Sequence, residues 1–144
     1  MIEDITTKHA RAYFTFIKAS SWMEKKIKGA LKPFGITHVQ LNVLHILYRN
    51  APEPVSVNSI KEQLLDSNPD VTRLLDRLTK KGFISRETCP NNRRRIDITL
   101  TKEGEAILYE AHKRAKISVG DFFEKKITEE EAIELKRIID KIIK

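Results

Sequence analysis

The sequence is poor in cysteine, glycine and proline. Its single cysteine, Cys89, excludes an internal disulfide, and together with four scattered histidines it makes no spacing that closes a zinc site. Five glycines and five prolines in 144 residues are too few for a linker or a disordered chain. We therefore expect a folded, helix-rich protein without a metal ion or other cofactor.

Long apolar runs and the usual marks of an enzyme are also missing. No stretch approaches the ~18 uninterrupted apolar residues that span a bilayer, and the chain opens with acidic Glu3 and Asp4 rather than a basic segment. There is no glycine-rich phosphate loop, no pair of metal ligands and no nucleophile beside a base. We expect a cytoplasmic protein that has no catalytic residues and does not act at a membrane.

Positive charge is abundant and unevenly placed. The formal net charge is +7 and the pI is near 9.5. The 23 residues from Arg73 to Arg95 contain eight basic and two acidic residues, and so carry +6 of that total. A field of this kind favours nucleic acid, an acidic partner or an anionic membrane surface. Its concentration in one segment makes that segment the candidate binding surface.

Apolar residues at helical spacing, with capping residues between the runs, predict a mainly α chain that forms one domain over residues 1–144. Thr37 and Gln40 match a capping box at the start of one helix, and Thr128 and Glu131 match another. The expected helices cover residues 5–31, 37–49, 58–65, 68–81, 101–123 and the segment from 128 onwards.

The first and last helices are expected to contact another subunit. At ~1.5 Å per residue the first helix is roughly 40 Å long, whereas a compact domain of this length has a radius of gyration of about 14 to 15 Å. The last helix carries Leu135, Ile138 and Ile142 on one stripe. Surfaces of this size and apolarity predict a dimer built on the two ends of the chain.

Two short helices joined by a tight turn, 58–65 and 68–81, have the dimensions of a helix-turn-helix. Asp66, Ser67 and Asn68 are the N-cap candidates for the second helix. That helix has an apolar stripe and leaves Asp70, Arg73, Arg77 and Lys80 on its outward faces, so it can pack on its neighbours and still enter a major groove.

A β-hairpin is predicted after this helix. Residues 83–88 and 96–100 are the expected strands, and the turn at 89–92 places Arg93, Arg94 and Arg95 at an arginine-rich tip. A loop arginine can enter the minor groove beside the helix in the major groove. Each arginine taken alone is also compatible with a solvated surface charge that contacts nothing.

Three stretches, residues 71–84, 89–94 and 100–104, together resemble the MarR family of bacterial regulators. The resemblance implies a winged helix-turn-helix DNA-binding lobe over 36–101, with dimerisation helices at 1–35 and 102–144. It implies a sequence-specific regulator of transcription, expected to be a repressor, that binds pseudo-palindromic double-stranded DNA as a homodimer. It also implies a small-molecule effector, whose pocket lies between the dimerisation helices and the DNA-binding lobe.

The family's wing reads Asp-x-Arg before Leu-Thr-x-x-Gly, which maps the minor-groove arginine onto Arg94 and the aspartate onto Asn92. A neutral amide lacks the charge that strengthens an Asp–Arg pair, so Arg93 or Arg95 can share the role of Arg94. The candidate DNA contacts are therefore Asn68, Asp70, Thr72, Arg73, Arg77, Lys80, Asn92, Arg93, Arg94 and Arg95.

Several alternatives stay open at this point. The same basic surface suits a winged-helix module that binds RNA or a protein partner. Tyr13, Trp22, His45 and Tyr48 suit either an effector pocket or a simple core. Cys89, beside the wing, is either a bystander or an oxidisable thiol.

Overall fold

The computed structural model describes residues 7–65 and 70–144. The chain forms two compact units, Leu31–Arg114 and the combined ends Met1–Ala30 with Ala115–Lys144. In the described part of the chain, no helix is both long and apolar enough to cross a membrane.

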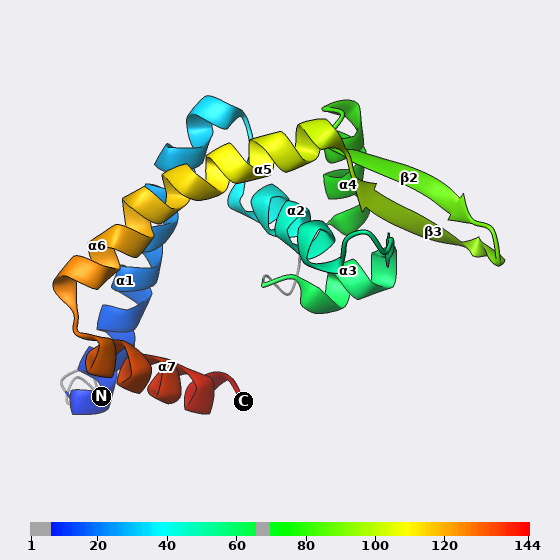
Figure 1. The fold of residues 1–144 in the computed structure, drawn as a ribbon. Helices are drawn as coiled ribbons and strands as arrows, with labels where there is room; N and C mark the ends of the chain where they lie inside the picture. The colour runs from blue at the N-terminus through cyan, green and yellow to red at the C-terminus, as the bar shows by residue number, and fades with distance from the viewer. Residues whose placement is uncertain (1–6, 66–69) are drawn as a thin grey trace. The chain divides into compact units, whose positions relative to one another are not determined.

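The central unit contains a three-stranded antiparallel sheet packed against short helices. The strands are ordered β1-β3-β2, with Val55 opposite Ile98 and Ile84 opposite Leu100. In Figure 1 the hairpin of β2 and β3 projects away from the body of this unit. The elements are η2 (Lys32–Phe34), α2 (His38–Asn50), β1 (Val55–Ser56), α3 (Val57–Gln63), α4 (Val71–Lys80), β2 (Ile84–Cys89), β3 (Asn92–Leu100) and α5 (Lys102–Ala115).

The core of this unit comes from the apolar stripes that the periodicity predicts. Residues of α2 contact β3, and residues of α4 contact β2. Burying these side chains removes apolar surface from water, and this stabilises the fold by about 25 cal/mol for each Å² buried. The fully buried large side chains include Leu44, Ile46, Leu47, Ile60, Leu75, Leu78 and Ile98.

The helix before α4 is shorter than the prediction of 58–65. It begins at Val57, because the Ser56 side chain accepts a hydrogen bond from the Ser59 N–H and acts as the N-cap. It ends at Gln63, because Leu64 adopts an extended conformation.

The predicted cap of the next helix is also corrected. Asp70, expected from the sequence on an outward face of the helix, is the N-cap of α4, and its Oδ1 accepts from the Arg73 N–H at 3.2 Å. A carboxylate at this point satisfies a free N–H and interacts favourably with the positive end of the helix. The N-cap candidates Asp66, Ser67 and Asn68 lie outside the described residues.

The second strand of the wing is longer than predicted, and the turn is shorter. Strand β3 begins at Asn92, which pairs with Cys89, so Arg93, Arg94 and Arg95 lie on a strand and not in the loop at the tip. The two-residue turn Pro90–Asn91 closes the hairpin. The register jumps from Thr88 opposite Ile96 to Cys89 opposite Asn92, so the three arginines have no paired residue on β2 and lie at an irregularity of β3.

The unit of the two chain ends is helical. It contains most of α1 (Lys8–Leu31), together with η3 (Lys116–Gly120), a π-helical turn, α6 (Asp121–Lys126) and α7 (Glu129–Ile143). Trp22 of α1 packs against Phe122 of α6 with ring centroids 5.0 Å apart and the planes tilted by 52°, and the Lys26 ammonium lies 4.8 Å from both ring centroids. The capping box predicted at Thr128 and Glu131 is confirmed at the start of α7.

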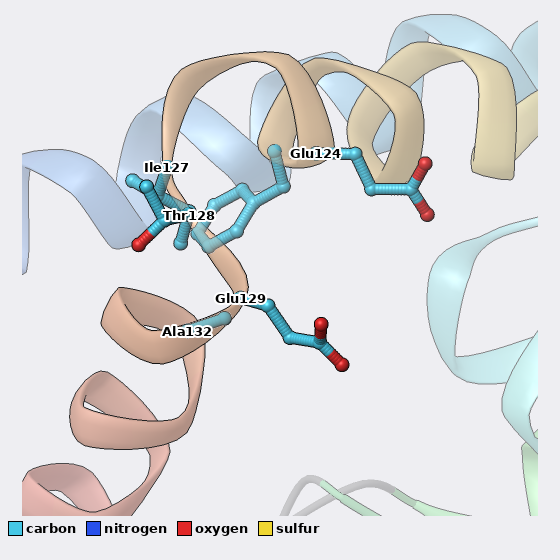
Figure 2. A pocket seen from close by; sticks show the side chains of 6 residues that line it. Glu124, Ile127, Thr128, Glu129 and Ala132 are labelled. Atoms are coloured by element: carbon cyan, nitrogen blue, oxygen red, sulfur yellow. The ribbon is translucent and has the colours of Figure 1, made fainter.

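This unit leaves most of its apolar side chains uncovered. Among its described residues only Ala10 is buried. A hollow of about 390 Å³ lies at the corner between α6 and α7. In Figure 2 the Glu124 and Glu129 side chains extend with their carboxylates away from Ile127 and Thr128. The exposed large apolar residues of this unit are Tyr13, Phe14, Phe16, Ile17, Trp22, Ile117, Ile133, Leu135, Ile138, Ile142 and Ile143.

Candidate nucleic-acid interface

Helix α4 has the division of faces that the sequence predicts. Val71, Leu74, Leu75 and Leu78 are buried against the rest of the central unit. The other side of the helix faces solvent and is basic, because it presents three cations and one hydroxyl. The exposed residues on this side are Thr72, Arg73, Arg77 and Lys80.

The three arginines of β3 are all exposed, but their surroundings differ. Arg95 Nε donates to Asp97 Oδ1 at 2.9 Å, and the Asp97 side chain is only 13% exposed, so Arg95 has an intramolecular counter-charge. In the described part of the chain, the side chains of Arg93 and Arg94 have no hydrogen-bond or ion-pair partner. The free guanidinium groups of the wing are therefore those of Arg93 and Arg94.

Asn92 contributes to the wing through the backbone. Its Oδ1 accepts from the Arg94 N–H at 3.1 Å, and among the described residues it makes no hydrogen bond with the Arg94 guanidinium. A side-chain oxygen that accepts from a backbone N–H two residues ahead is an Asx-type turn, which fixes the start of the strand. Asn92 therefore orders the backbone at Arg94, while the charged end of Arg94 stays unrestrained.

A polar hollow of about 400 Å³ brings the wing together with the start of α3. Its lining includes Ser56 and Asn58 from α3 and its cap, and Arg94 and Arg95 from β3. Sequence reasoning had missed Ser56 and Asn58 as members of this surface. The antiparallel pairing of Ser56 with Asp97 brings Ser56 and Asn58 next to the wing. A local sequence pattern cannot predict a pairing between residues so far apart in sequence.

A second cavity, of about 390 Å³, lies between α2 and α5 inside the central unit. His45 Nε2 and His112 Nδ1 are 3.1 Å apart at its wall, with the two rings edge to face. One imidazole must donate and the other accept, so at least one of the pair is neutral when they bond. The full lining is His45, Tyr48, Arg49, Glu105, Leu108, Tyr109 and His112.

Burial lowers the pKa of His45 below its ordinary value, and the nearby His112, Arg49 and His38 lower it further. Of the four residues proposed from sequence as pocket or core, His45 and Tyr48 line this cavity. Tyr13 and Trp22 belong to the other unit and are exposed there.

Acidification is expected to weaken folding through His45. Because the unfolded histidine titrates at about 6.5, above the pKa of the folded one, the unfolded chain takes up this proton first. The free energy of unfolding, measured by urea at pH 6.0 and 7.5, should be lower at pH 6.0. In His45→Gln this difference should shrink, whereas the control His9→Gln, at an exposed site on α1, should keep it. If wild type and His45→Gln lose the same unfolding free energy between pH 7.5 and 6.0, His45 is not the cause of the pH dependence.

Comparison with known proteins identifies the family. The MarR family model matches residues 36–96, which run from α2 into the wing. The multiple antibiotic resistance protein MarR of Salmonella typhimurium is 31% identical over 121 residues, which are 83% of this chain and 82% of that protein. This chain belongs to the MarR family.

Solved structures agree with this assignment. A cysteine-to-serine mutant of Escherichia coli MarR complexed with operator DNA superposes with a TM-score of 0.79 at 26% identity, covering 90% of this chain and 91% of that one. A Staphylococcus aureus MepR–DNA complex gives 0.81 at 27% identity, covering 91% and 95%. The predicted fold class, mainly α with a β-hairpin wing, is confirmed, and this MarR-family protein is a winged-helix transcription regulator.

Proposed function

We propose that this MarR-family protein is a transcriptional repressor that binds a pseudo-palindromic operator in duplex DNA as a homodimer. Helix α4 enters the major groove, and Arg94 of the wing reaches the adjacent minor groove. The observation that carries the proposal is the joint exposure of Arg73, Arg77 and Lys80 on α4 with Arg93 and Arg94 on β3, within one unit. The mutual repulsion of free cations gathered in one unit is relieved when a polyanion neutralises them.

The proposed DNA contacts on α4 differ in their chemistry. Arg73 and Arg77 can bond guanine edges or phosphates, and Lys80 suits phosphate. Thr72 at the start of α4 supplies a hydroxyl, and Asp70 contributes by capping the helix. Asn68, Asn92, Arg93 and Arg95 complete the proposed interface, with Asn92 acting through the backbone of the wing.

The proposed dimer uses the two ends of the chain. The exposed apolar side chains of α1 and α7 form a surface that a second copy can bury. We infer that the whole chain, 1–144, acts as one MarR-like domain, in which 36–101 is the DNA-binding lobe and 1–35 and 102–144 are dimerisation helices. The same reasoning makes it a cytoplasmic protein, because its operator lies there.

An effector is part of the proposal. A small molecule changes DNA binding only if it binds one spacing of the two recognition helices better than the other. The cavity between α2 and α5 is a concave, mainly apolar site with a few polar groups, which is the usual form of a small-molecule site.

The decisive experiment is footprinting of the purified protein on the DNA upstream of its own gene, with the mass of the complex measured in parallel. We expect one protected pseudo-palindrome bound by two chains of 16.7 kDa. Random duplex should compete weakly. Equal competition by random duplex, or tighter binding of an RNA of the same sequence, would replace the proposal with the RNA or protein-partner alternative.

A further inference from the structure

The eight basic residues between 73 and 95 do not share one environment, and Lys81, although exposed, directs its ammonium to acceptors on another helix end. Its ammonium donates to the Gly35 carbonyl oxygen and lies 3.4 Å from Gln40 Oε1. Gln40 is only 3% exposed and is the one buried polar side chain among the described residues. Gln40 Oε1 also accepts from the Thr37 N–H at 3.1 Å, as part of the capping box.

These interactions join two helix ends. Lys81 is the C-cap of α4, and its own N–H donates to the Arg77 carbonyl. Gly35 ends the short η2 with a left-handed φ of 65°, just before the cap of α2. The Lys81 side chain therefore links the C-terminal end of α4 to the N-terminal end of α2, across 46 residues of sequence.

A second interaction holds α4 at its middle. Asp76 Oδ1 accepts from Arg86 Nη1 of β2 at 2.6 Å, and both side chains are partly exposed. Exposed ion pairs of this kind add little to stability, so we assign this pair an effect on geometry. The neighbouring Lys80 is exposed, as Lys81 is, but it has no hydrogen bond or ion pair within the described residues.

We propose that Lys81 is a positioning residue for the recognition helix and not a phosphate contact. Base readout needs the helix at a fixed angle in the groove, because bidentate hydrogen bonds tolerate little displacement. A lysine that fixes one end of α4 on α2 sets that angle, while Lys80 one residue earlier faces solvent and phosphate. This inference rests on the proposed DNA-binding function.

The test compares Lys81→Met with Lys80→Met, each measured on the footprinted operator and on random duplex over a range of salt. Lys81→Met should lower operator affinity about tenfold, leave random-duplex affinity unchanged and leave the salt slope unchanged. Lys80→Met should weaken both duplexes and make the slope shallower by about 2, since each phosphate contributes about 0.9 in both protomers. Lys81→Gln, which keeps a neutral donor for Gln40, should retain most of the operator preference.

The outcomes separate cleanly. If Lys81→Met and Lys81→Gln both make the slope shallower, Lys81 is a phosphate contact. If either lowers binding to the two duplexes equally at constant slope, its role is stability of the fold alone. Unchanged operator binding by Lys81→Met would also overturn the proposal. Failure of the DNA-binding function itself would appear earlier, as a wild-type protein without operator preference.

Discussion

Operator binding by the dimer is expected to weaken by about 10⁴- to 10⁵-fold when salt rises from 50 to 200 mM. The side chains of five exposed basic residues of the interface have no intramolecular partner among the described residues. If four or five of them contact phosphate in each protomer, the dimer neutralises about eight to ten charges. The slope of log K against log salt should then be about −7 to −9, because each neutralised phosphate contributes about −0.9. These residues are Arg73, Arg77, Lys80, Arg93 and Arg94.

The measurement is fluorescence anisotropy of labelled operator titrated with protein at several salt concentrations. Random duplex measured alongside gives the sequence-independent part of the binding. A slope near −2 on operator would contradict the proposed footprint, because it would leave most of these cations outside the interface.

Arg94→Ala is expected to weaken operator binding by about 1 to 3 kcal/mol, because its guanidinium is proposed to reach base edges in the minor groove. The structural reason is that Arg94 is exposed and its guanidinium is unpaired among the described residues, while Asn92 fixes its backbone. The change should leave the dimer and its melting temperature intact, since removing a solvated side chain costs little stability.

Arg95→Ala is the matched control on the same strand. Arg95 is already paired with Asp97, so a bound phosphate would have to compete with that carboxylate. We expect its loss to weaken binding less than the loss of Arg94. Unchanged affinity of a correctly folded Arg94→Ala dimer would remove Arg94 from the interface, and a larger effect at Arg95 would transfer the minor-groove role to that residue.

Much of the fold was predictable because its causes are local in sequence. The capping boxes at Thr37 and Thr128 satisfy helix N–H groups with side chains three residues away, and both are present in the structure. The apolar stripe of α4 follows from 3.6-residue periodicity alone. The family resemblance carried by the segments around α4 and the wing is likewise confirmed.

The N-cap of α4 and the length of the hairpin turn differ from the predictions, because the sequence offers alternatives of similar energy at both places. Asp70 caps α4 in place of the residues before it, because several short polar side chains in a row are all good N-caps. The wing arginines lie on a strand because the turn closes at Pro90–Asn91, and turn length is set by strand pairing as well as by composition.

The sequence by itself determined the helical periods, the two capping boxes, the hairpin and the concentration of charge between Arg73 and Arg95. Only the tertiary structure decided which of those charges are free. Lys81 bonds to Gly35, Arg86 pairs with Asp76, and His45 meets His112 from 67 residues away. Such pairs form because helix packing and strand register bring distant side chains within bonding distance. The spacing of residues along one segment cannot predict these long-range contacts.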